Sequence, residues 1–230
     1  MRVRSAALFE FARGPAPLAC AMADLPVRDL AVQRLLRVED EGAYVARLGV
    51  GGLDPETARR ASDYVAGITR QKRWLDFLID RFYRGDVRTL EPVLLQILRI
   101  GAYDLVERGV KPHAAVNEAV ETARRLMHRG AAGLTNAVLR AVGRALRDGA
   151  LPEPDSGDRA DDLAVRHSHP TWMVRRWLDR WGDEATEALL RTNNEPARYA
   201  LRVTAGAPGR EALLETLADL GADPEASRWL

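Results

Sequence analysis

The sequence predicts a mainly α-helical protein, a helical bundle followed by a further helical segment and the start of a truncated α/β subdomain. Three observations predict this fold class. Apolar residues recur with helical spacing almost throughout residues 26–147. Glycines follow the periodic stretches and mark helix ends at Gly109, Gly130 and Gly149. Hydrophobic residues make up 47% of the 230-residue chain, which is enough to bury a core.

The first predicted helices lie between residues 27 and 83. The stretch VRDLAVQRLLRVEDEG has one apolar face, and Gly42 is expected to end it. The next helix begins with Asp54 as N-cap and Pro55 at the first helical position. We expect this second periodic stretch to break near residues 69–72 and so to form two helices.

Three more helices are predicted before the linker. The first begins at residue 89 or 90 and stops at Gly109, the second follows Pro112 and stops near Gly130, and the third ends at Gly149. The short connections between them are typical of a bundle or of orthogonally packed helices.

Three residues in these helices conflict with a simple apolar core. Gly101 lies in mid-helix, where it costs about 1 kcal/mol, so we expect it to permit close approach of another helix. Asn117 and Asn136 lie on or beside apolar faces. Because a buried amide without partners is destabilising, we expect both to have a structural role, each tying its helix to a neighbour.

The C-terminal third changes character twice. Residues 148–163 are rich in acid, Pro and Gly and are predicted to be a linker. A helix is expected to begin at Pro170 and Thr171. Residues 199–204, YALRVT, alternate as a β-strand does, and GREALLETLADLG is an amphipathic helix. The predicted organisation is a disordered leader at 1–24, a helical domain at 25–147, the linker at 148–163, and at 164–230 a helical segment that enters a second domain.

Several classes of function lack their sequence signals. Cys20 is the only cysteine, so neither an internal disulfide nor a cysteine-based zinc site is expected. The chain has no G-x-S-x-G motif, no phosphate-binding loop and no run of about 18 apolar residues. Glu10 and Arg13 interrupt the only stretch that resembles a signal peptide. We therefore expect a cytoplasmic protein without a membrane, a metal site or a catalytic residue of its own.

Charge is distributed unevenly and favours a polyanionic partner. Residues 59–147 contain 17 Arg and Lys against 9 Asp and Glu, although the net charge of the whole chain is only +1. An ordinary solvated face would mix both signs. The candidate RNA-binding cations form three groups: Arg70, Lys72 and Arg73; Arg124, Arg125 and Arg129 at a helix end; and Arg140, Arg144 and Arg147 along one helical face.

Five short blocks resemble one known family. LQILRIGAYDL, PHAAVNEAVE and GLTNAVLRAV resemble the NusB-like helical domain of the RsmB/Sun/Fmu family of small-subunit rRNA (cytosine-5) methyltransferases. HSHPTWMVRRW and NNEPARYALRV resemble the segments that follow in that family. The resemblance implies that the first domain binds rRNA. It also implies that Asn193, Asn194 and Arg202 belong to the segment that leads into an RNA-recognition-like subdomain.

The same resemblance implies that the catalytic core is missing. The family's core binds S-adenosylmethionine and carries catalytic cysteines, and no such motif occurs in these 230 residues. We expect no cofactor to bind this chain and no methylation by it alone, so the core would have to act in cis or in trans. Two other functions stay open: a free-standing NusB-type antitermination factor that binds transcript RNA, and a protein scaffold whose basic face is incidental.

Overall fold

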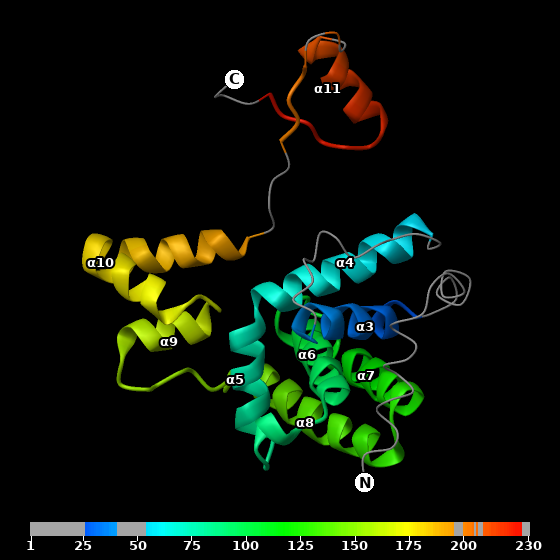
Figure 1. Ribbon diagram of the computed structural model, residues 1–230, viewed down its shortest axis with the longest axis vertical. Coiled ribbons are helices and arrows are strands. Elements are labelled where there is room, and N and C mark those ends of the chain that lie inside the picture. The colour runs from blue at the N-terminus through cyan, green and yellow to red at the C-terminus, as the bar shows by residue number, and fades with distance from the viewer. Residues whose placement is uncertain (1–25, 41–53, 196–199, 205, 207–208, 227–230) are drawn as a thin grey trace. The chain divides into compact units, whose positions relative to one another are not determined.

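The computed structural model describes residues 26–40, 54–195, 200–204, 206 and 209–226 (Figure 1). The predicted leader at 1–24 and the predicted helix end at Gly42 lie outside the described residues. The chain divides into two compact units, Met1–Asn194 and Glu195–Leu230. Helices dominate the first unit, as predicted, and none of the described helices is long and apolar enough to cross a membrane.

The first unit begins with helices α3 (Val27–Asp40), α4 (Pro55–Arg70) and α5 (Lys72–Phe82). Asp54 caps α4 as predicted, because its side chain accepts a hydrogen bond of 2.9 Å from the Thr57 amide. The predicted break between α4 and α5 falls at Gln71, which ends one helix and begins the other.

Helix α6 (Pro92–Val106) lies at the centre of the bundle and packs against α3, α4, α5, α7 and α8. Most of its residues are buried, in keeping with a mainly apolar sequence, and the buried set includes Gln96, Arg99 and Asp104. Helices α7 (Pro112–Leu126) and α8 (Arg129–Arg147) follow it and pack closely against each other (Figure 1). Proline occupies the first position of both α6 and α7, where no amide hydrogen bond is lost.

Gly101 has the role that the sequence predicts. A Cβ added to Gly101 would lie 2.2 Å from Leu139 Cδ1 on α8 and 3.2 Å from Ala119 Cβ on α7. Real side chains do not approach so closely, so glycine lets α6 pack directly onto this pair of helices. The packed core is one cluster of aliphatic side chains drawn from α3 to α8.

Two predicted helix boundaries are wrong. Helix α6 begins at Pro92 rather than at residue 89 or 90, because Val87–Thr89 form a separate 3-10 turn capped by Asp86. Helix α7 ends at Leu126, and α8 begins at Arg129 rather than after Gly130. The reason is a cap: His128 Nδ1 accepts a 3.2 Å hydrogen bond from the Ala131 amide. Arg129 therefore begins α8 instead of ending α7.

Buried charged side chains join helices of the bundle at two places. Asp29 on α3 is almost fully buried and receives two hydrogen bonds, of 2.7 and 2.9 Å, from the Arg125 guanidinium on α7. Arg99 on α6 is also buried, and its Nε and Nη2 donate to both oxygens of Asp76 on α5 at 2.6 and 2.8 Å. In the first pair an arginine satisfies a buried carboxylate, and in the second the partly exposed Asp76 satisfies a buried arginine, so neither buried charge is left alone.

A smaller layer follows the bundle. Asp158 caps α9 (Arg159–Arg166) by accepting a 2.9 Å hydrogen bond from the Ala160 amide. The helix thus begins inside the stretch predicted as a linker at 148–163, since acidic residues suit the first turn of a helix. Helix α10 (Thr171–Asn194) starts where predicted and bends at Gly182, which has a φ of 75°.

The second unit contains α11 (Arg210–Asp219), which confirms the predicted helix, although none of its residues is buried. The predicted strand at 199–204 is not formed by its described residues, 200–204; Tyr199 lies outside the described residues. A strand needs a neighbour to pair its backbone donors and acceptors, and the described residues include no other strand.

Candidate nucleic-acid interface

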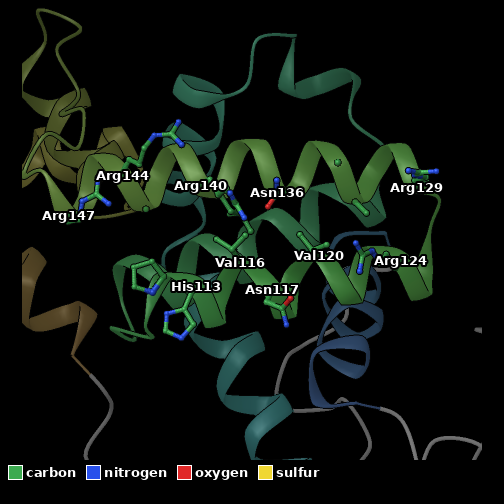
Figure 2. A pocket seen from close by; sticks show the side chains of 15 residues that line it. His113, Val116, Asn117, Val120, Arg124, Arg129, Asn136, Arg140, Arg144 and Arg147 are labelled. Carbon is green, nitrogen blue, oxygen red and sulfur yellow. The ribbon is translucent and has the colours of Figure 1, made fainter.

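A groove lies between α7 and α8 and has a volume of about 740 Å³ (Figure 2). We call it the α7–α8 groove. Apolar and small side chains line its bottom: Val116, Val120, Ala132, Gly133, Leu139 and Gly143. Cationic and polar side chains line the remainder: His113, Asn117, Arg124, Arg129, Asn136, Arg140, Arg144 and Arg147. Pro112, at the start of α7, completes the lining.

The groove follows from two helical periodicities. The lining residues of α8 recur every three or four positions, so they share one face of the helix. They are Arg129, Gly133, Asn136, Arg140, Arg144 and Arg147. Thr135, Val138 and Val142 on the opposite face are buried against the bundle. On α7, His113, Val116, Val120 and Arg124 share a face by the same spacing. The two faces meet along the groove in Figure 2.

The electrostatics of the groove are one-sided, because its lining includes five arginines and no carboxylate. Arg129, Arg140 and Arg144 form no ion pair with any residue in the described part of the chain, and all three are exposed. Arg124 and Arg147 each contact one carboxylate outside the lining, Glu121 at 2.5 Å and Asp148 at 3.0 Å. Such exposed pairs are weak and leave both guanidinium groups able to exchange partners.

The structural role predicted for Asn117 and Asn136 is wrong. Asn117 is exposed and Asn136 is only half-buried, and both line the α7–α8 groove (Figure 2). Neither amide forms a hydrogen bond with a described residue. Helical spacing placed both residues beside an apolar stripe, but that stripe forms the bottom of an open groove at these positions rather than the inside of the core.

The cluster predicted at Arg70, Lys72 and Arg73 lies away from the groove and is held by internal contacts. Arg73 donates to the backbone oxygen of His169 at 2.6 Å, and it also contacts Asp161 and Thr171. Lys72 contacts Glu39 at 2.5 Å, and Arg70 donates to the Asn194 oxygen at 3.4 Å. These side chains join the end of α4 and the start of α5 to neighbouring helices, which reduces their availability to a ligand.

The remaining predicted residues are also outside the groove. Arg125 is bound to buried Asp29. Asn194 donates to the His167 oxygen at 2.9 Å, and the Asn193 amide lies 3.5 Å from His169 Nε2, so both fix the turn before α10. Arg202 is exposed in the second unit.

Sequence reasoning missed His113 and Gly133 as parts of the groove. A Cβ added to Gly133 would meet nothing within 4 Å, so this glycine leaves open space at the bottom of the groove. The available signal was the face that Gly133 shares with Arg129, Asn136 and Arg140. No cluster of three or more metal-ligating side chains occurs among the described residues.

Comparisons with known proteins match two families along the chain. The NusB family matches residues 25–144, and the RsmF/B-like methyltransferase ferredoxin-like domain matches residues 169–230. The probable ribosomal RNA small subunit methyltransferase B of Bacillus subtilis (strain 168) is 31% identical over 207 residues, which covers 86% of this chain and 45% of that protein. A putative methyltransferase of Mycobacterium tuberculosis (strain ATCC 25618 / H37Rv) is 32% identical over 183 residues, covering 74% of this chain and 39% of the relative.

A more distant relative and a solved structure agree with these matches. The ribosomal RNA small subunit methyltransferase B of Escherichia coli O1:K1 / APEC is 26% identical over 203 residues, covering 85% of this chain and 44% of that protein. The crystal structure of PH0851 superposes with a TM-score of 0.55 at 16% identity, covering 90% of this chain and 47% of that one, and supports the fold alone. The chain therefore spans less than half the length of these relatives.

The second matched segment separates the alternatives that the sequence left open, because a free-standing antitermination factor does not account for a ferredoxin-like domain at residues 169–230. With a matched NusB domain followed by that domain, the chain belongs to the NusB family and has the organisation of the N-terminal part of the RsmB/Sun/Fmu family of rRNA methyltransferases.

Proposed function

We propose that this chain is the RNA-binding N-terminal portion of a small-subunit rRNA (cytosine-5) methyltransferase and that its α7–α8 groove holds the RNA backbone. The observation that carries the proposal is the lining of the groove, which has five arginines and no carboxylate. A guanidinium group binds phosphate oxygens through two parallel hydrogen bonds, so it suits this ligand better than a lysine would.

The arrangement of the arginines supports an extended ligand. Arg129 and Arg147 lie at opposite ends of α8, about 27 Å apart along the helix axis at 1.5 Å per residue. Arg140 and Arg144 lie between them, one helical turn apart. A row of cations over this length fits several successive phosphates rather than a single anion. Such contacts supply affinity and orientation but do not read sequence.

The chemistry of methyl transfer belongs to another part of the enzyme. S-adenosylmethionine carries a positively charged sulfonium group, and the arginines of the α7–α8 groove would repel it. This groove therefore does not fit the methyl donor, and no catalytic step is assigned to its residues. We propose that a core domain in cis or in trans binds the cofactor, while this chain positions rRNA of the 16S type in the cytoplasm.

The proposal is tested by measuring the affinity of the full chain for a small-subunit rRNA fragment at several salt concentrations. The double variant Arg140→Gln/Arg144→Gln removes two phosphate contacts. The slope of log affinity against log salt should become shallower by about 0.7–0.9 for each contact, and affinity at low salt should fall at least roughly tenfold.

Arg84→Gln is the matched control, since Arg84 is exposed, lies outside the groove and carries the same charge. It should leave the salt slope almost unchanged. The control removes one charge and the double variant two, so a loss of log affinity in the control that is half the loss in the double variant would mean that only net charge matters. RNA affinity that is unchanged in both variants would exclude the groove from the interface.

A further inference from the structure

Two neutral amides lie among the cations of the α7–α8 groove, and phosphate binding does not require them. Asn136 lies on α8 between Arg129 and Arg140, and Asn117 lies on α7 across from it (Figure 2). Neither amide has a hydrogen-bond partner in the described part of the chain. Asn136 is half-buried beside Val116 and Leu139, so its donor and acceptor groups are available only to something that enters the groove.

The bottom of the groove is apolar next to Asn136. Val116 and Val120 keep 7% and 9% of their surface exposed and present this aliphatic edge to a ligand, whereas Leu139 is fully enclosed and faces Gly101 in the core. Gly133 lies one turn before Asn136 and leaves the space above it open. A sugar-phosphate backbone gains nothing from aliphatic surface, whereas the face of a nucleobase does.

We propose that the α7–α8 groove takes single-stranded RNA, with a base inserted against Val116 and Val120 and with Asn136 reading the edge of that base. This inference rests on the proposed RNA-binding function and adds the class of RNA and a residue that determines specificity. Asn117, exposed on α7, is the second neutral amide in the lining of the groove.

The size of the groove suits an inserted base. At about 740 Å³ it lies within the range of roughly 300–1,000 Å³ that is usual for pockets that enclose small organic ligands. An inserted base fits such a space, but a double helix does not. A duplex also keeps its bases stacked and paired, and its deep major groove is too narrow for side chains to read. A duplex could therefore contact only the outer arginines.

An amide is suited to base recognition because it donates and accepts at once. Asn pairs with the N6 and N7 atoms of adenine through two hydrogen bonds, and it can also bind the edges of other unpaired bases. Because Asn136 carries no charge, it contributes nothing to counterion release. Loss of its amide should therefore change which base is preferred without changing the salt dependence of binding, whereas loss of an arginine should do the reverse.

The experiment measures binding of the full chain to three ten-nucleotide RNAs, oligo(A), oligo(U) and oligo(C), and to an RNA duplex of the same length. We expect the single strands to bind more tightly than the duplex and oligo(A) to be preferred. Asn136→Leu keeps a similar volume but removes both polar groups, and it should reduce the preference about tenfold while the salt slope stays unchanged.

Two controls separate this inference from the function on which it rests. Arg140→Gln should weaken binding of all three single strands equally and make the salt slope shallower. Gln71→Ala, which removes an amide outside the groove, should change neither property. Duplex binding as tight as that of the single strands, or a base preference that survives Asn136→Leu, would overturn base reading but leave RNA binding intact. Failure of every RNA to bind would overturn the proposed function itself.

Discussion

The hydroxyl of Tyr64 on α4 donates a 2.8 Å hydrogen bond to Oδ1 of Asp104 on α6, and both side chains are buried. The other oxygen of Asp104 accepts from Arg28 on α3, at 2.8 Å from Nη2 and 3.2 Å from Nε. One buried carboxylate thus joins three helices. Burial of the phenol and the neighbouring charge of Asp104 raise the pKa of Tyr64 to about 12.

The change Tyr64→Phe should destabilise the bundle by about 1–2 kcal/mol, because it leaves one lone pair of Asp104 unsatisfied. It should also change how the free energy of unfolding depends on pH above about pH 10. The raised pKa of Tyr64 favours the folded state below pH 10, and this contribution is lost as the pH rises towards 12. The free energy of unfolding, measured in urea from pH 8 to 11.5, should decline less steeply for the variant than for the original protein. Equal slopes would contradict the raised pKa of Tyr64.

Replacing Gly101 and Gly133 with alanine should change the stability of the protein in opposite directions. At Gly101 the new methyl group would collide with Leu139, so Gly101→Ala should destabilise the protein by about 1–3 kcal/mol despite its better helix propensity. At Gly133 nothing lies within 4 Å, so Gly133→Ala should stabilise by about 0.5–1 kcal/mol. Denaturant midpoints of the two variants, measured side by side, check the prediction, which fails if both shift in the same direction.

The imidazole of His167, at the end of α9, should lower the free energy of unfolding as the pH falls below about 6.5. Burial and the nearby charge of Arg166 lower the pKa of His167 to about 4, so the folded state holds the ring neutral. The associated stability is present above about pH 6.5 and is lost as the pH falls towards 4, because the unfolded chain binds the proton first. His167→Gln should reduce the loss of stability between these two values in urea titrations. An NMR titration of His167 with a midpoint near 6.5 would refute the prediction.

Arg73 and Arg144 form a matched pair that separates a structural arginine from a ligand-binding one. Arg73→Gln removes the hydrogen bonds to His169 and Thr171, so it should lower stability by about 1 kcal/mol without changing RNA affinity. Arg144→Gln should lower RNA affinity without changing the melting temperature, since this side chain has no internal partner among the described residues. If Arg73→Gln instead lowered RNA affinity and Arg144→Gln did not, the interface would lie at Arg70, Lys72 and Arg73.

The sequence predicted what is local in the fold. The cap at Asp54, the break at Gln71 and the close approach at Gly101 all depend on residues near one another in the chain or on a single small side chain. The start of α8 was missed because its cap is His128, which is a less usual capping residue than Ser, Thr, Asp or Asn.

Four of the ten predicted cations, Arg70, Lys72, Arg73 and Arg125, have partners that the sequence could not show, because those partners are remote in the chain. Asp29 lies 96 residues from Arg125, and Asp161 lies 88 residues from Arg73. Only the folded chain brings these opposite charges together. The asparagines were misassigned for a related reason: periodicity shows that Asn136 lies beside an apolar stripe, but not whether a neighbouring helix or open space lies above that stripe.

The open space at Gly133 allows the ligand preference of this domain to change without cost to its folding. A Cβ introduced at Gly133 would meet nothing within 4 Å, whereas one at the tightly enclosed Gly101 would collide with Leu139. Over evolutionary time, related chains could therefore retune what they recognise through position 133 while the architecture beneath it stayed the same.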